Sequence, residues 1–191
     1  MKMNVSVQVS GEDHIRNIEL LGFRPHGLTV IQSWEQIGLY LRAIDLYGVD
    51  LFVEIGMAWG GLQQFITPRT KFVPEFNYIG TELQASTAPK QNWQRGVYMN
   101  MGDHFGAGFS EILHRAIAAS RVTFLFCDGG NKPKEIGYFH KFLRVGDYIC
   151  THDFTDEVQE EDLDCLRSDW EEVEPELYRA ALIPLFRRVA A

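Results

Sequence analysis

An apolar segment that runs directly into a turn of small residues constrains the fold of this chain more than any other feature. Residues 51–55, Leu-Phe-Val-Glu-Ile, are apolar at four of five positions, as in a buried strand of a parallel sheet. A helix is expected over residues 61–67, and its N-terminus would favour polar or anionic groups of a ligand. Small side chains let the backbone between strand and helix approach a ligand closely. Four of them stand here: Gly56, Ala58, Gly60 and Gly61.

The spacing of the glycines separates two classes of nucleotide site. A dinucleotide fingerprint has the form Gly-x-Gly-x-x-Gly, whereas this chain has Ala58 at the middle position and places Gly60 and Gly61 side by side. The acidic residue two positions before Gly56, Glu54, resembles the first motif of class I S-adenosylmethionine methyltransferases, where it lies near the amino-acid end of the cofactor. This resemblance favours S-adenosylmethionine over NAD. A glycine-rich turn in another doubly wound domain is the alternative.

Strand-like and helix-like segments alternate along the chain, which is typical of a parallel sheet with right-handed crossovers. Ser33 can cap a helix over residues 34–47, which would end at Gly48. Further strands are expected over 77–83, 96–102, 121–127 and 147–151, and further helices over 109–120 and 134–143. We therefore expect one α/β domain over 1–191, with a cap and lead-in helix in 1–50, a cofactor-binding core in 51–154 and an acidic segment in 155–191.

The acidic charge of the chain is concentrated near its C-terminus. The net charge is −8, but residues 156–176 hold eleven carboxylates and one arginine, a local charge of −10. The total of −8 less −10 leaves +2 for the remaining body. We expect a solvated helix in this segment, with Val158, Leu163 and Leu166 on its packing side; a docking surface is the alternative. The chain lacks a basic stripe with interleaved aromatic residues, so a nucleic acid is not the expected partner.

Composition and length set further bounds. A chain of 191 residues with 46% hydrophobic residues is long and apolar enough to fold alone. It has no apolar run that would span a bilayer and no signal-peptide-like start, so we expect a cytoplasmic protein. The three cysteines predict neither a disulfide nor a zinc site.

The segment after Asp153 predicts an unusual edge of the sheet. Methyltransferases usually add an antiparallel hairpin after the fifth strand, but only 38 residues remain here. Residues 170–174 and 183–189 could be short strands, yet Pro175 and Pro184 favour edge positions or irregular structure. We therefore expect a reduced or atypical hairpin, whose uncovered apolar edge predicts a homodimer.

Polar residues follow every expected strand, at the edge of the sheet where ligands of open α/β sheets bind. Glu82 and Leu83 end the second strand, Gly102, Asp103 and His104 end the third, and Asp128, Lys132, His152 and Asp153 follow the fourth and fifth. A carboxylate at the position of Glu82 can accept hydrogen bonds from both ribose hydroxyls of an adenosine. Asp103 resembles the methyltransferase residue beside the adenine, with His104 at the rim.

Asp128, His152 and Asp153 form the second candidate constellation. If the fourth and fifth strands are neighbours, these side chains converge and could hold Mg²⁺, which prefers oxygen ligands. Such a cation would orient a substrate hydroxyl and lower its pKa. In the alternative interpretation, Asp128 caps the following turn and Asp153 caps the acidic helix.

The run Phe124–Lys132, with the run Leu143–Asp153 after it, resembles the cephalosporin hydroxylase-like family and the related metal-dependent sugar and macrolide O-methyltransferases. The resemblance covers roughly residues 27–154 and includes Gln32, whose counterpart lies close to the cofactor. It implies a Rossmann-like methyltransferase fold with strand order 3-2-1-4-5 and helices on both faces.

Carried to this sequence, the resemblance implies that Asp128 and Asp153 are metal ligands. His152 stands where the family often has an acid, so a different divalent ion or a metal-free general base is also open. Lys132 is placed like the lysine base of catechol-type O-methyltransferases. That role needs a lowered pKa, and otherwise Lys132 is a solvated charge.

These observations predict an S-adenosylmethionine-dependent methyltransferase that methylates an oxygen of a small hydroxylated molecule with the help of a divalent cation. A non-catalytic nucleoside-binding or regulatory module of the same fold is the first alternative. An NAD(P)-dependent oxidoreductase is the second.

Overall fold

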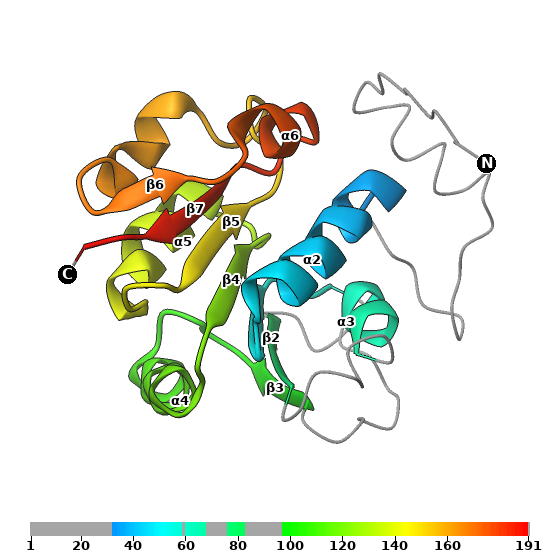
Figure 1. Ribbon diagram of the computed structural model, residues 1–191. Coiled ribbons are helices and arrows are strands. Elements are labelled where there is room, and N and C mark those ends of the chain that lie inside the picture. The colour runs from blue at the N-terminus through cyan, green and yellow to red at the C-terminus, as the bar shows by residue number, and fades with distance from the viewer. Residues whose placement is uncertain (1–31, 59, 68–75, 83–96, 191) are drawn as a thin grey trace.

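The computed structural model describes residues 32–58, 60–67, 76–82 and 97–190. Its centre is a seven-stranded sheet with the order β3-β2-β1-β4-β5-β7-β6 (Figure 1). The strands are β1 (Leu51–Ile55), β2 (Asn77–Glu82), β3 (Val97–Met101), β4 (Thr123–Cys127), β5 (Tyr148–Thr151), β6 (Trp170–Glu172) and β7 (Leu185–Arg188). The first five are parallel to one another, so the predicted α/β class and the predicted order 3-2-1-4-5 are confirmed.

The hairpin after β5 is present as two short strands, which lie within the ranges 170–174 and 183–189 that the sequence indicated. Strand β7 pairs antiparallel with β5, and β6 pairs antiparallel with β7. The two prolines do not interrupt these strands, because Pro175 opens helix α6 and Pro184 directly precedes β7. Since β7 covers the edge of β5, the apolar edge on which a homodimer was predicted does not exist. Dimerisation itself stays a prediction.

Helices cover both faces of the sheet, as predicted. The helical elements are α2 (Trp34–Tyr47), α3 (Gly61–Ile66), α4 (Ala107–Ala119), α5 (Lys132–Phe139), η2 (His140–Phe142), η3 (Glu160–Leu166) and α6 (Pro175–Ala180). Buried side chains of α2, α3 and α6 pack with Phe52, Phe124 and Phe126 on one face. Those of α4, α5 and η3 pack with Val53 and Leu125 on the other. Successive side chains of a strand point to opposite faces of the sheet, so each strand contributes residues to two separate hydrophobic cores.

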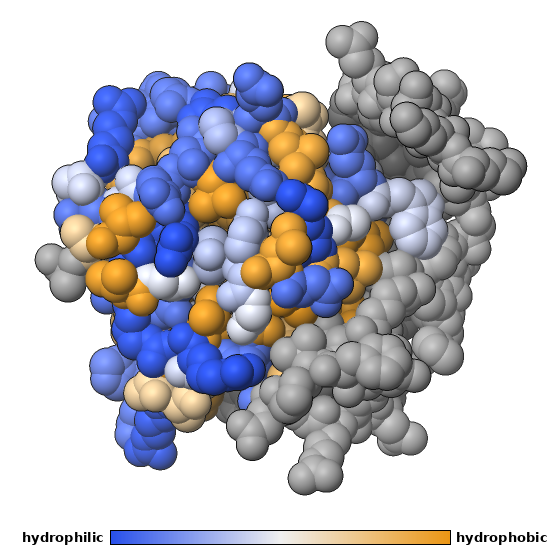
Figure 2. Space-filling model, viewed as in Figure 1, coloured by the Kyte–Doolittle hydropathy of each residue, from blue (hydrophilic) through white to orange (hydrophobic). Residues whose placement is uncertain are grey.

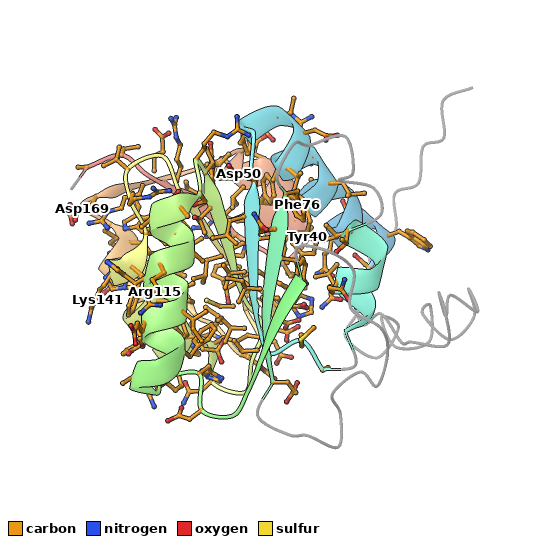
Figure 3. All side chains as sticks on the ribbon, turned by 90° about the horizontal axis from the view of Figure 1, so that it is seen from below. Tyr40, Asp50, Phe76, Arg115, Lys141 and Asp169 are labelled. Carbon is orange, nitrogen blue, oxygen red and sulfur yellow. The ribbon has the colours of Figure 1, made fainter. Side chains whose placement is uncertain are left out.

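Helix α2 begins and ends where the sequence predicts. The Ser33 side chain accepts a hydrogen bond from Gln36 N, the Gln36 side chain accepts one from Ser33 N, and Gly48 follows the helix in the left-handed conformation. This reciprocal capping satisfies two donors that a helix start leaves free. Tyr40 reaches from α2 to the sheet (Figure 3). Its ring packs there against Phe52 and Phe126. Helix α2 is thereby packed against β1 and β4.

The acidic segment does not form the predicted helix. It is divided among the short 3-10 helix η3, strand β6 and helix α6. On the coloured face of Figure 2, hydrophilic residues alternate with hydrophobic patches. The predicted packing side is confirmed, since Val158, Leu163 and Leu166 are all buried. The Arg179 side chain ties the parts together by pairing with carboxylates of both η3 and β6. In the part of the chain that the structure describes, the helices are too short or too polar to span a bilayer.

Candidate functional site

The sheet register brings the residues that follow β1, β4 and β5 together at one edge. Ile55 is paired with Cys127, and Cys127 with Thr151. The backbone continues this pairing by one residue, because Asp128 N donates to Ile55 O at 2.9 Å and His152 N donates to Cys127 O at 3.1 Å. The glycine turn, Asp128 and the His152–Asp153 pair are therefore neighbours because of the strand order.

The turn after β1 approaches the turn after β4 so closely that Gly56 has no room for a side chain. A Cβ atom on Gly56 would lie 2.4 Å from Gly129 Cα and 2.6 Å from Asp128 O, and its φ of +83° disfavours other residues. Ala58 and Gly60 also have positive φ angles. Gly61 starts α3, which has six residues and ends one residue earlier than predicted. The small residues predicted to bind a cofactor thus form a tightly turned segment over the edge of β1.

Glu54 is buried beneath this turn. Its carboxylate accepts a hydrogen bond from the Tyr78 hydroxyl, and its exposed fraction is 2%. Burial is the main reason that the pKa of Glu54 is raised to about 8, partly offset by the hydrogen bond from Tyr78. The side chain lies on the α2 face of the sheet, among the aromatic rings of that core. A direct contact of Glu54 with a cofactor stays a prediction.

The residues predicted to bind the adenosine lie together at the ends of β2 and β3. Gly102, with a φ of +124°, donates from its backbone N to Glu82 O at 3.0 Å. Asp103 is exposed, and its carboxylate accepts a hydrogen bond from Phe105 N at 2.9 Å. The side chain of His104 is buried, and among the described residues its Nδ1 has no hydrogen-bond partner. Leu83 lies outside the described residues.

A buried polar atom without a partner is costly, and the position of His104 Nδ1 is one that a ligand can satisfy. His104 is the third residue after β3, two residues from Gly102 and one from Asp103. Together with the half-buried carboxylate of Glu82, it supplies groups that a nucleoside needs at this edge. These residues therefore fit an adenosine.

Asp128, His152 and Asp153 converge as predicted, and one ligand atom from each lies within 4.8 Å of the others. His152 Nδ1 is 3.2 Å from Asp128 Oδ1 and 3.0 Å from Asp153 Oδ1. Burial alone would lower the pKa of His152, but the hydrogen bonds and charges of the two carboxylates raise it to about 9. The N-caps of the two helices that follow are other residues, Asn131 for α5 and Gln159 for η3, and a role of Asp128 in capping the turn after β4 stays an alternative.

Lys132 lies inside this cluster, but its surroundings do not suit a general base. Its Nζ is 3.0 Å from Asp153 Oδ2, 2.5 Å from Glu157 Oε2 and 3.8 Å from Asp128 Oδ1. Burial alone would lower the pKa of Lys132, but the hydrogen bond to Glu157 and the charges of Asp128 and Asp153 raise it above its ordinary value. A base needs the opposite shift, and the side chain is not a solvated charge either, since it is buried.

Two glutamines of the N-terminal region complete the cluster. Gln32 Nε2 donates to Asp128 Oδ2 at 2.7 Å, so the predicted site residue Gln32 touches the acidic cluster itself. Gln36 Oε1 lies 3.2 Å from His152 Nε2. The sequence does not mark Gln36 as a site residue, because a glutamine three residues after Ser33 is typical of a helix capping box.

Glu135 is a further residue that the sequence did not single out. Its buried carboxylate accepts hydrogen bonds from Gly129 N at 3.1 Å and Asn131 N at 3.2 Å, and so holds the turn that carries Asp128. Burial is the main cause that raises the pKa of Glu135 to about 7. A Cβ atom on Gly129 would lie 2.2 Å from Glu135 Oε1, so a larger residue at position 129 would displace the Glu135 carboxylate. In the sequence, Glu135 is a glutamate in the first turn of a predicted helix. Glutamates are common there because they interact favourably with the helix dipole, so the position alone did not indicate a role in the site.

The chain was compared with protein-family models, with curated proteins and with solved structures, and only the solved structures gave matches. No protein-family model matches the chain, and no curated protein matches it. The solved structure of CmcI-N160 in its apo form is similar, with a TM-score of 0.70 and 17% identity over 88% of this chain and 77% of that one. The cmcI-D160 Mg-SAM structure gives a TM-score of 0.66 and 16% identity over the same shares.

A third similar structure is a putative caffeoyl-CoA O-methyltransferase from Staphylococcus aureus. It gives a TM-score of 0.61 and 13% identity over 95% of this chain and 93% of that one. Identities this low compare folds rather than functions. The strand order with its antiparallel hairpin and these three likenesses together show that the chain has the Rossmann-like fold of S-adenosylmethionine-dependent methyltransferases.

Proposed function

We propose that the protein is an S-adenosylmethionine-dependent methyltransferase that methylates a hydroxyl oxygen of a small molecule. The observation that carries the proposal is the single edge of the sheet at which the Gly56 turn, Glu82, His104 and the acidic cluster all meet. The names of the similar structures support it, since they include an O-methyltransferase and a Mg-SAM complex. An NAD(P) site has less support, because Ala58 replaces the middle glycine of its fingerprint.

Each part of the cofactor has a group on this chain to hold it. The carboxylate of Glu82 would accept hydrogen bonds from the ribose hydroxyls, and Asp103 with His104 Nδ1 would face the adenine. The turn from Gly56 to Gly60 would leave space for the amino-acid end, near Gln32 and Glu54. S-adenosylmethionine supplies an already activated methyl group, so the protein has mainly to place the acceptor oxygen in line with it.

The acidic cluster fits a divalent cation. An octahedral ion with ligands at about 2.1 Å places adjacent ligand atoms about 3 Å apart. The two contacts of His152 Nδ1, at 3.2 Å to Asp128 and 3.0 Å to Asp153, agree with that spacing. A bound cation would lower the pKa of a hydroxyl that it touches. The chain itself orients this position through Gln32, which fixes Asp128, and Lys132, which fixes Asp153.

Isothermal titration with S-adenosylhomocysteine tests the cofactor assignment. The wild type should bind it, and Glu82→Gln should weaken binding roughly 10-fold or more, because a ribose hydrogen bond to a charged group contributes about 1.5–3 kcal/mol. Glu111→Gln, on the exposed face of α4, is a control that also removes one carboxylate. Absence of binding to the wild type, or equal effects of both substitutions, would remove the support for this site.

The cation is tested separately from the cofactor. Turnover of a panel of small polyhydroxylated and phenolic acceptors should fall after EDTA treatment and return with Mg²⁺ or Mn²⁺. Asp128→Asn should lose the metal response while it retains its fold. If EDTA leaves turnover untouched and Asp128→Asn remains active, the chain is a methyltransferase that works without a cation. If S-adenosylhomocysteine binds but no acceptor is methylated, a non-catalytic nucleoside-binding module is the better description.

A further inference from the structure

Gln36 has a side-chain amide whose orientation is fixed by two partners of unambiguous chemistry. Its Oε1 accepts a hydrogen bond from Ser33 N at 2.9 Å, and its Nε2 donates to Ala181 O at 2.9 Å. A backbone N–H can only donate and a carbonyl oxygen can only accept. Rotation of the amide by 180° would therefore break both bonds, and the side chain is buried, so water cannot replace them. The oxygen of Gln36 must be the atom that faces His152.

This orientation determines which ring nitrogen of His152 carries a proton. Gln36 Oε1 lies 3.2 Å from His152 Nε2 and offers only an acceptor. The favourable arrangement is a proton on Nε2 that is donated to Gln36. Nδ1 then faces two carboxylates, Asp128 at 3.2 Å and Asp153 at 3.0 Å. When a cation displaces the Nδ1 proton, the ring nitrogen and the two carboxylate oxygens become three ligand atoms that converge on one point.

We propose that Gln36 is a positioning residue that fixes the Nε2–H tautomer of His152 and thereby makes Nδ1 a metal ligand beside Asp128 and Asp153. The inference rests on the cation of the proposed function and names the atom through which His152 would bind it. Histidines that bind metals usually donate their other ring N–H to an acceptor that sets the tautomer and the ring orientation. Gln36 provides that acceptor from helix α2, far from the cluster in the sequence.

The nitrogen ligand also predicts which cation the site prefers. Mg²⁺ is bound almost entirely by oxygen, whereas Mn²⁺ and later divalent ions accept imidazole more readily. Two carboxylates and one imidazole should therefore select Mn²⁺ over Mg²⁺. Gln36 contributes to that selectivity because it keeps the Nδ1 lone pair, rather than an N–H, directed at the ion.

The test measures Mn²⁺ binding by electron paramagnetic resonance on the full chain, with Mg²⁺ as the competitor. Gln36→Met has nearly the same shape but no acceptor oxygen, and it should weaken Mn²⁺ binding about 10- to 100-fold. Ser33→Ala is the matched control. It removes the side chain that caps the same helix start but does not touch His152, so Mn²⁺ affinity should stay within about 2-fold of wild type.

A second measurement does not depend on any variant. Long-range ¹H–¹⁵N spectra of histidine-labelled wild-type protein loaded with Zn²⁺, assigned with His152→Gln, should show Nε2 protonated and Nδ1 bound to the metal. A spectrum with Nδ1 protonated would overturn the inference, as would Gln36→Met that folds and binds Mn²⁺ like wild type. Absence of Mn²⁺ and Zn²⁺ binding to the wild type would overturn both this inference and the cation of the proposed function. Binding of S-adenosylhomocysteine would be untouched by that last result.

Discussion

Replacing Glu54 by glutamine should stabilise the folded protein, and the gain should depend on pH. The Glu54 carboxyl is buried under the glycine turn, and its pKa is raised from 4.5 to about 8, chiefly because burial disfavours the charged form. Glutamine has nearly the same shape and an oxygen that can accept the Tyr78 hydrogen bond, but it cannot ionise. The variant therefore removes the cost of burying a charge and keeps the local packing.

The size and direction of the effect follow from the two pKa values. Below pH 4.5 the Glu54 carboxyl is protonated in both states, so its contribution to stability is complete there. As the pH rises, the unfolded chain releases this proton first, and stability falls until the folded carboxyl also ionises at about pH 8. Each pH unit in this window corresponds to about 1.4 kcal/mol. The interval from 4.5 to about 8 thus gives a loss of about 5 kcal/mol above pH 8, and about 3 kcal/mol at pH 7.

Urea unfolding followed by tryptophan fluorescence and circular dichroism at pH 5, 7 and 8.5 measures this difference. The free energy of unfolding of Glu54→Gln should exceed that of the wild type by an amount that grows from pH 5 to pH 8.5. Glu111→Gln, which removes an exposed carboxylate from α4, should follow the wild type at every pH. Parallel stability curves for the wild type and Glu54→Gln between pH 5 and 8.5 would refute the reasoning.

Three further predictions concern other parts of the structure. Gly56→Ala should unfold the protein or weaken S-adenosylhomocysteine binding at least 10-fold, because the new Cβ atom would clash with the backbone of Gly129. Gly48→Ala is the control, since Gly48 also has a positive φ, +68°, but has no atom within 4 Å of the added Cβ. Gly48→Ala should lower the free energy of unfolding in urea by only about 1 kcal/mol. Tyr40→Phe should raise the melting temperature, since its buried hydroxyl has no partner among the described residues. Lys132→Met should lower the free energy of unfolding by about 1–3 kcal/mol, because it leaves the partly buried carboxylates of Asp128 and Asp153 without this counter-ion. An unchanged unfolding curve for Lys132→Met would show that this ion pair is energetically neutral.

The central strands β1, β4 and β5 could be predicted from the sequence because each is a short, mostly apolar run bounded by turn residues. The same is true of α2, whose cap Ser33 and final Gly48 mark both ends. The C-terminal region could be predicted only in part: the ranges 170–174 and 183–189 contain β6 and β7, but the way these strands pair could not be predicted. Its elements are short, and the pairing of β7 with β5 is a long-range contact that no local pattern records. The two prolines were interpreted as residues that interrupt a strand. Pro175 instead lies at the start of helix α6, where proline is tolerated.

The candidate site shows the same division between local and long-range information. Asp128, His152 and Asp153 were found because each directly follows a strand, and the order of parallel strands decides which residues become neighbours. Gln36 and Glu157 escaped notice because they reach the cluster from a helix and a loop. The surroundings of Lys132 were equally hidden: a lysine four residues after an aspartate carries no sign that Glu157 will raise its pKa.

Charge within the cluster explains why a cation can enter a site that already contains a lysine. Asp128, Asp153 and Glu157 bring three negative charges when ionised, while Lys132 and protonated His152 bring two positive ones. The cluster then keeps one net negative charge. A divalent ion that replaces the His152 Nδ1 proton changes this balance from −1 to neutral, and it leaves Lys132 with Glu157 outside the three ligand atoms. Lys132 and the cation therefore need not compete, because each neutralises a different side of Asp153.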